Sequence, residues 1–369
     1  MLTKDSTKGI EEQDLLHPII PISGTAQSDF VAPAVFPNKP LEQPIQKYLP
    51  QGNETNNLAL LRTFGHNLTV DPITKRAVVS KGDYSVIIVN YDATNDELRT
   101  TTQQLLDILI LKYKESNYEI PEIYLSYAEY MKWRHLTDKT SAKEQFISDV
   151  KILGKTSIPL TEKSIEKIND SNLNAGDIDR GYIQIAGGAL FLDDGIVFSL
   201  GDKFQKVISS YPLMPYIEQL LTIHSNNNPN SYNLLRKISL QKNMNIGKPN
   251  ENIIAVNTLL DVCEYIPSYE KVKSGDRAYT RRIITPFERD MDALANSFSW
   301  EYCHKSGVPL SEEELRFFSY KTFISCLILI TWHDYPKREL KEKKLETDSK
   351  KKKNTNTAKK KANNQKGNN

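Results

Sequence analysis

Cysteine is scarce in this chain, which has only three in 369 residues. Cys263, Cys303 and Cys326 lie far apart and form no CxxC or Cys/His pattern. A disulfide framework and a zinc site both need such spacing, so the sequence indicates neither. This cysteine usage is typical of a reducing cytoplasm, which is the compartment that we expect.

Long apolar runs are missing as well. No run approaches the roughly 20 residues that a membrane-spanning helix needs. The first residues, MLTKDSTKGIEEQD, also lack the apolar core of a signal peptide. We therefore expect a cytoplasmic protein with no membrane partner.

The signatures of several enzyme classes are also absent. The six histidines occur singly, so the His-hydrophobic-His cluster of a rolling-circle initiator is not present. Neither a GxxxxGK[ST] phosphate loop nor a GxSxG nucleophile elbow occurs. The glycine pair in AGGAL, residues 186–190, lies in a strand pattern and predicts a β-bulge. We expect no enzyme activity, no cofactor and no metal.

The net charge of +2 combines two parts of opposite sign. Residues 337–369 carry 13 Lys and Arg against 4 Asp and Glu, and the rest of the chain carries 35 against 42. An acidic body with a basic end does not by itself indicate nucleic-acid binding, so only local patches could. The lysine run either solubilises the protein or attracts DNA phosphates without sequence preference.

The pattern along the chain predicts five regions. Residues 1–56 are rich in proline and read as a flexible arm, and residues 57–95 have β-branched runs typical of a strand hairpin. Two globular regions follow, at 96–212 and 213–335, and then a disordered Lys-rich tail at 336–369.

Both globular regions show the same predicted order of elements. In the first, helical periodicity at 96–114 precedes a short strand at 123–125, a helix capped by Ser126, a helix at 141–155 and a hairpin turning at residues 193–195. The second repeats this order with helices at 229–245, 258–265 and 276–294, a strand at 252–257, and wing strands at 298–303 and 322–333. We predict an α+β fold with two tandem winged-helix domains.

The stretch DRAYTRRIITPFERDMDAL, residues 276–294, predicts an amphipathic helix that Pro286 kinks or restarts. At 100° per residue, Thr280 joins five apolar residues on one side, and the other side is largely basic. In a helix-turn-helix this outer side would lie in the major groove, where arginine pairs with guanine or clamps phosphate. The candidate DNA-binding residues here are Lys271, Lys273, Arg277, Tyr279, Arg281, Arg282, Thr285 and Arg289.

The corresponding face of the first region is mixed, because Glu144 and Asp149 accompany its basic residues. Phosphate positioning, a protein interface and plain solvation all remain open for it. Its candidate DNA-binding residues are Lys143, Ser148, Lys151 and Lys155.

The segments AYTRRIITPFERDMDAL and NPNSYNLLRKISL resemble the plasmid replication initiators of theta-replicating type. That resemblance, over roughly residues 96–335, implies two winged-helix domains that bind repeated origin sequences in double-stranded DNA. It also implies a homodimer that represses its own gene, a monomer that opens the origin, and host partners that include a helicase and a host initiator. A winged-helix transcriptional regulator and an interaction scaffold that binds no DNA remain the alternatives.

Overall fold

The computed structural model describes residues 48–50, 68–81, 84–93, 98–159, 182–211, 213–224, 226–273, 278–316 and 318–336. All of them belong to one compact unit, Gln46–Asn369, with a mixed α+β structure. The predicted arm before Tyr48, the predicted tail after Pro336, and Arg277 lie outside the described residues. The domain boundaries given above remain predictions.

The elements fall into two sequential parts. The first part contains β1 (Tyr48–Pro50), β2 (Leu68–Asp71), β3 (Arg76–Lys81), β4 (Tyr84–Ile88), α2 (Thr100–Glu115), β5 (Glu122–Ser126), α3 (Tyr127–Arg134), α4 (Lys139–Lys155), β6 (Thr156–Pro159), β7 (Tyr182–Gln184), β8 (Ala186–Phe191), β9 (Gly195–Leu200), α6 (Asp202–Ser209) and β10 (Leu213–Pro215). The second contains α7 (Gln219–Thr222), α8 (Ser231–Met244), β11 (Ile253–Ala255), α9 (Val256–Leu260), α10 (Tyr269–Lys273), the π-helical turn η2 (Thr280–Ile284), α11 (Thr285–Asp292), β12 (Phe298–Cys303), α12 (Glu312–Arg316), α13 (Tyr320–Ser325) and β13 (Leu327–Trp332).

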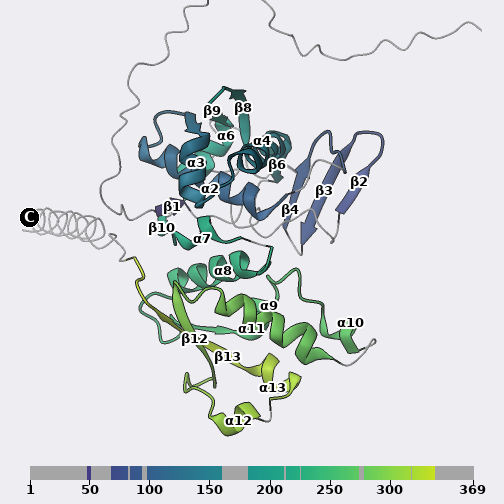
Figure 1. Ribbon diagram of the computed structural model, residues 1–369, viewed down its shortest axis with the longest axis vertical. Helices are drawn as coiled ribbons and strands as arrows, with labels where there is room; N and C mark the ends of the chain where they lie inside the picture. Colours follow the sequence, from purple (N-terminus) through teal and green to yellow (C-terminus); the bar gives the residue numbers. More distant parts are fainter. Residues whose placement is uncertain are drawn as a thin grey trace, which may run out of the picture. The chain divides into compact units, whose positions relative to one another are not determined.

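Each part builds a three-stranded antiparallel sheet with the same connectivity. The first has the order β5-β9-β8 and the second β11-β13-β12, so in both the strand after the first helix pairs with the last strand. Figure 1 shows α4 beside the β8–β9 hairpin and α11 beside α8, and these pairs are in contact. The repeated element order predicted from the sequence is therefore present in the described residues.

A second sheet extends the first part. Its strands have the order β2-β3-β4-β6-β7, and β4 pairs with β6, which begins where α4 ends. The hairpin predicted within 57–95 is thus joined by hydrogen bonds to the strand that follows the third helix. The two-stranded pair of β1 and β10 is also antiparallel.

Local chemistry explains several boundaries. Ser126 caps α3, because its side chain accepts a hydrogen bond of 3.1 Å from the Glu129 N–H. The strand register shifts between Ala186 and Gly188, which is the bulge that the glycine pair predicts. Gly195 lies against the Leu125 carbonyl, so β5 and β9 could not approach each other if a Cβ were present there.

Several predicted elements differ from the structure. The last wing strand starts at Leu327 and not at Thr322, because Ser319 caps a short helix, α13, by accepting a 3.1 Å hydrogen bond from Thr322. The strand predicted at 252–257 ends at Ala255, and the helix predicted at 258–265 is α9, Val256–Leu260. The predicted turn at 266–275 contains another short helix, α10, which buries Val272.

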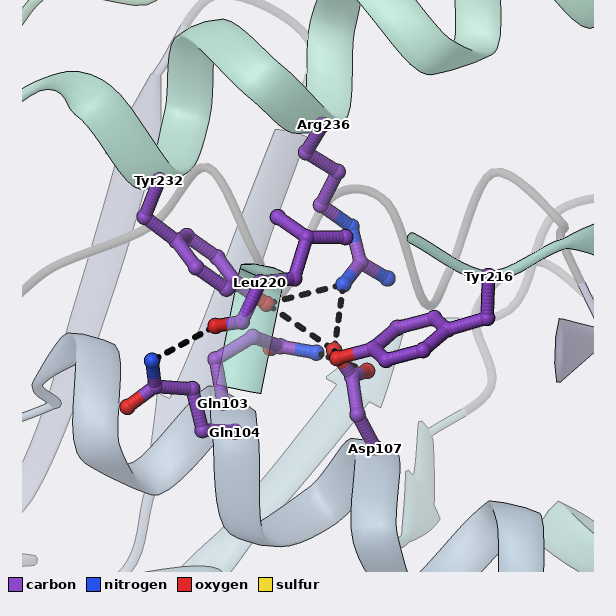
Figure 2. Close-up of polar contacts among 7 residues, drawn as sticks. All are labelled: Gln103, Gln104, Asp107, Tyr216, Leu220, Tyr232 and Arg236. Atoms are coloured by element: carbon purple, nitrogen blue, oxygen red, sulfur yellow. Dashed lines mark hydrogen bonds and ion pairs between the residues drawn. The ribbon is translucent and has the colours of Figure 1, made fainter. Parts of the chain in front are cut away.

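A buried polar cluster joins the two parts, as Figure 2 shows. Asp107 of α2 has an exposed fraction of 0%, and its Oδ2 accepts hydrogen bonds from Arg236 Nη1 at 2.8 Å, Tyr216 Oη at 2.9 Å and Tyr232 Oη at 3.0 Å. Its Oδ1 accepts one from Gln103 at 3.1 Å. The single carboxylate therefore fixes side chains of α2, α8 and the segment before α7 against one another. We call these five residues the Asp107 cluster.

The groups of the Asp107 cluster shift one another's pKa values. Burial lowers the pKa of Arg236, but the neighbouring Asp107 carboxylate outweighs it, so the pKa of the guanidinium is raised overall. Burial, together with Asp107, also raises the pKa values of Tyr216 and Tyr232 well above the ordinary tyrosine value. The cluster thus contains an ionised pair and two neutral phenols.

Candidate nucleic-acid interface

The helix of residues 280–292 buries one side and exposes the other. Ile283, Ile284 and Phe287 are at most 3% exposed, as are Met291 and Leu294 beyond them. The predicted apolar side is therefore correct for these five positions. Thr280 was expected on the same side but is exposed, because the π-helical turn advances less than 100° per residue and rotates it outward.

Pro286 has the effect that the sequence predicts, in a specific form. The Thr285 N–H donates to the Thr280 carbonyl, five residues back, and α11 starts at Thr285 with the proline in its first turn. Proline has no N–H and its ring clashes with the carbonyl four residues earlier, and a wider π turn relieves both problems. The helix consequently restarts without losing its packing side.

The basic side of this helix is exposed. Arg281, Arg282 and Thr285 are exposed, as are Lys271 and Lys273 on α10. Two acidic residues of the helix contact β12: Glu288 accepts a 3.0 Å hydrogen bond from Tyr302, and Asp292 accepts one of 3.0 Å from Trp300. These two carboxylates are thus paired with the sheet.

Arg289 and Tyr279 make specific contacts within the protein. The Arg289 guanidinium is half exposed and donates two hydrogen bonds, of 2.9 and 2.7 Å, to Asp290 Oδ1. Tyr279 is half-buried, and its ring lies 5.8 Å from that of Tyr320 in an edge arrangement. A DNA contact by either residue remains a prediction. Because Asp290 partly neutralises the charge of Arg289, that arginine would attract a DNA phosphate less strongly than an unpaired arginine.

Asp290 is a positioning residue that the sequence reasoning missed. It is fully buried, and its Oδ2 accepts hydrogen bonds from the Asn230 N–H at 3.1 Å and from Asn230 Nδ2 at 2.7 Å. Ser231 Oγ also donates to the Asp290 carbonyl at 2.7 Å. These bonds attach α11 to the beginning of α8. An acidic residue inside an amphipathic helix resembles an ordinary solvated one in sequence, so only its contacts reveal the role.

A tyrosine group lies next to the basic side. The rings of Tyr269 and Tyr320 are stacked at 4.0 Å with an interplanar angle of 9°, and Lys273 Nζ lies 6.0 Å from the Tyr269 ring. This group brings α10, α13 and the start of η2 together. Tyr269 and Tyr320 are far apart in the sequence, so no local pattern could have placed them at the candidate interface.

The corresponding helix of the first part, α4, is less uniform. Lys143 and Lys151 are exposed, Ser148 and Lys155 are half-buried, and the Lys143 ammonium lies 4.8 Å from the Tyr127 ring. Lys155 Nζ donates a hydrogen bond of 3.4 Å to the Asn90 carbonyl next to β4. Lys155 is therefore at the junction with the five-stranded sheet, away from the beginning of the helix.

The expected outward position of Asp149 is wrong. Asp149 is 1% exposed, and its Oδ1 accepts hydrogen bonds from Thr101 Oγ1 at 3.1 Å and Thr102 Oγ1 at 2.6 Å. Burial raises its pKa to about 6, although the threonine hydrogen bonds oppose the shift. The carboxylate binds the first turn of α2, whose N–H dipoles favour a negative charge. The exposed face of α4 is accordingly less acidic than the sequence predicted.

Within the described ranges there is no group of three or more His, Cys, Asp or Glu side chains that could hold a metal ion. None of the described helices has the length and apolar character required to cross a membrane. The arginine-bearing side of η2 and α11 is therefore the candidate site that the sequence and the structure both emphasise.

Comparisons with known proteins add little. No known protein family matches the chain, and no curated protein matches it. Among solved structures, the chain is similar to a crystal structure of selenomethionine derivatives of domain 2 and domain 3 of RctB, with 8% identity and a TM-score of 0.42. The match covers 76% of this chain and 99% of that chain. A likeness of this degree assigns no function to this chain.

Proposed function

We propose that this protein binds double-stranded DNA sequence-specifically through two tandem winged-helix domains and acts as a plasmid or mobile-element replication initiator. The observation that carries the proposal is the helix of residues 280–292, which buries Ile283 and Phe287 and exposes Arg281 and Arg282. The identical strand order of the two three-stranded sheets supports the tandem arrangement. In such a unit the third helix is the element that enters the major groove.

The two parts of the chain have different roles in this proposal. The helix of the second part contacts base edges through Arg281 and Arg282 and phosphates through the α10 lysines. The first part positions the protein on the backbone through Lys143 and Lys151, or it carries the homodimer interface. The initiator role rests on the resemblance of residues 276–294 to the theta-type plasmid initiators. The same resemblance implies that the partners are origin repeats in DNA and host replication proteins. The protein would work in the cytoplasm, without enzymatic activity, a cofactor or a metal.

Selection from a pool of random duplexes tests the DNA-binding part of the proposal. The full chain should enrich one sequence motif, and Arg281→Ala with Arg282→Ala should abolish the enrichment. Absence of any enriched motif with the wild-type chain would exclude sequence-specific recognition and would favour the interaction scaffold.

A second experiment separates an initiator from a regulator. An initiator should bind several direct repeats of the selected motif and melt adjacent AT-rich DNA, which permanganate reactivity of unpaired thymines detects. A regulator that shares the fold should bind the same repeats and leave the neighbouring duplex unreactive.

A further inference from the structure

A cavity of about 800 Å³ lies where the first turn of α2, the turn between α3 and α4, and the segment that holds Ile223, His224, Asn226 and Pro229 meet. Four side chains that are or can become cationic line it, namely Arg99, Arg134, His135 and His224. None of the residues predicted to bind DNA lines this cavity. Its chemistry is therefore separate from the candidate nucleic-acid interface.

Arg134 is the fixed cation of the cavity. The residue is 2% exposed, its Nε donates to the Leu221 carbonyl at 2.9 Å, and its Nη1 donates to Tyr130 Oη at 2.8 Å. These two hydrogen bonds use Nε and Nη1, and the charge of the guanidinium also interacts with that of the buried Asp149. A buried guanidinium held in this way presents a directed donor to whatever occupies the cavity.

The surrounding groups add positive potential. Thr100 and Thr101, in the first turn of the 16-residue helix α2, line the cavity, and that turn itself contains no acidic residue. The buried Asp149 of α4, which accepts hydrogen bonds from Thr101 and Thr102, offsets part of the positive potential there. Asp138 is the one carboxylate among the lining residues, and it accepts hydrogen bonds from the N–H groups of Thr140 and Ser141 at the start of α4. These N–H groups at the start of α4 partly offset the negative charge of Asp138.

His224 responds to this environment. Burial lowers the pKa of His224, and the charges of Arg134 and His135 lower it further. An anion in the cavity would reverse these repulsions. The positive end of the cavity is thus complementary to a group with several negative oxygens.

The remaining wall is apolar. Leu98, Leu136 and Ile223 line it, together with Tyr265, which is 49% exposed. A volume of this size falls within the range of small-molecule sites, which combine apolar walls with a few directed polar groups. An aromatic ring beside the apolar side chains suits a heterocyclic base or a similar flat group.

We propose that this cavity binds a small phosphate ester of nucleotide size, with its phosphate on Arg134 Nη2 and His224 and its organic group against Tyr265 and the apolar wall. The bound ester would contact α2 and the α3–α4 turn on one side and Ile223, His224 and Tyr265 on the other. It would therefore stabilise the junction between the two parts. A phosphate of the DNA backbone has the same chemistry, so the test separates the two sources.

The experiment uses the full chain and isothermal titration calorimetry with four probes: ATP, AMP, inorganic phosphate, and a short duplex of random sequence. ATP and AMP should bind more tightly than inorganic phosphate, because only they reach the apolar wall. His224→Gln keeps the size of an exposed side chain and should weaken nucleotide binding by about tenfold, the effect of one lost charge-assisted hydrogen bond. Arg134→Gln should weaken it more, and Lys203→Gln, an exposed cation on α6, should leave it unchanged.

The pH dependence gives a second readout that does not rely on Arg134 variants folding. After correction for the second ionisation of the AMP phosphate, whose pKa is about 6, wild-type affinity for dianionic AMP should rise as the pH falls and His224 becomes protonated. Asp149, whose charge interacts with that of Arg134, should act in the same direction as it loses its charge. Arg99, Arg134, His135 and Asp138 are the other charged or titratable groups facing the site. His224→Gln should flatten this dependence.

The outcomes are distinct. Nucleotide binding that His224→Gln weakens and Lys203→Gln preserves would support the proposal. No detectable binding of ATP or AMP would overturn it. If only the random duplex binds and His224→Gln weakens that binding, the cavity belongs to a DNA phosphate, and the proposal is likewise overturned. Loss of sequence-specific DNA recognition is a separate result, because it concerns Arg281 and Arg282.

Discussion

The Asp107 cluster predicts a large and specific loss of stability. Replacing Asp107 by Ala removes the carboxylate that Arg236, Tyr216 and Tyr232 share. Arg236 is 5% exposed, and within the described residues its Nε and Nη2 already lack hydrogen-bond partners. Its charge would then be buried without compensation, which costs about 3–5 kcal/mol. Urea unfolding followed by circular dichroism at pH 7 measures this loss directly.

A matched pair of variants isolates the charge effect. Asp261→Ala removes an exposed carboxylate at the end of α9 and should change the free energy of unfolding by no more than about 0.5 kcal/mol. Combining Asp107→Leu with Arg236→Met removes both charges and should recover most of the loss, although the two tyrosine hydroxyls lose their acceptor. The reasoning is refuted if Asp107→Ala costs less than about 1 kcal/mol or if the double variant is as unstable as the single one.

Three further predictions concern single features. Asp149→Asn should remove a pH dependence of stability. The pKa of Asp149 is about 6 in the folded protein against an ordinary 3.8, so the free energy of unfolding of the wild type should fall by roughly 3 kcal/mol as the pH rises through that window. The variant should not show this loss, and urea unfolding at several pH values measures the difference. If wild type and variant lose stability in parallel, Asp149 is not the titrating group. Ser126→Ala should cost about 1 kcal/mol, because the N-cap of α3 is lost, and an unchanged urea midpoint would argue against that cap. Ending the chain at Pro336 should lower affinity for all duplexes and flatten its salt dependence if the predicted lysine tail binds phosphates, whereas equal salt slopes would assign the tail to solubility.

The sequence predicted best the features that depend on neighbouring residues. Ser126 as a cap, the strand of residues 122–126, the bulge at Gly188 and the restart at Pro286 all follow from local backbone chemistry. The buried side of residues 283–294 follows from helical periodicity. Such features need no knowledge of the rest of the chain.

Long-range contacts set the features that the sequence could not supply. Asp149 was expected outside, but it is buried because Thr101 and Thr102 of a distant helix bind it. Arg236 belongs to a segment that reads as an ordinary basic helix, and its buried partner Asp107 comes from the first part of the chain. A charged side chain in an amphipathic pattern has the same sequence signal whether water or a distant partner satisfies it. The cationic cavity was missed for the same reason, because four separate segments form it.

The central claim is the proposal that Arg281 and Arg282 give the second part of the chain a preference for one DNA sequence. Once the selected duplex is known, titration of the double alanine variant against that duplex and a scrambled one tests the claim most directly. A double alanine variant of Lys203 and Arg76, two exposed cations in the first part of the chain, removes the same charge and serves as the control. We predict that the variant at positions 281 and 282 loses about 1–3 kcal/mol per base-pairing arginine on the selected duplex and much less on the scrambled one. Equal losses on both duplexes, or a loss no larger than that of the control, would contradict the account.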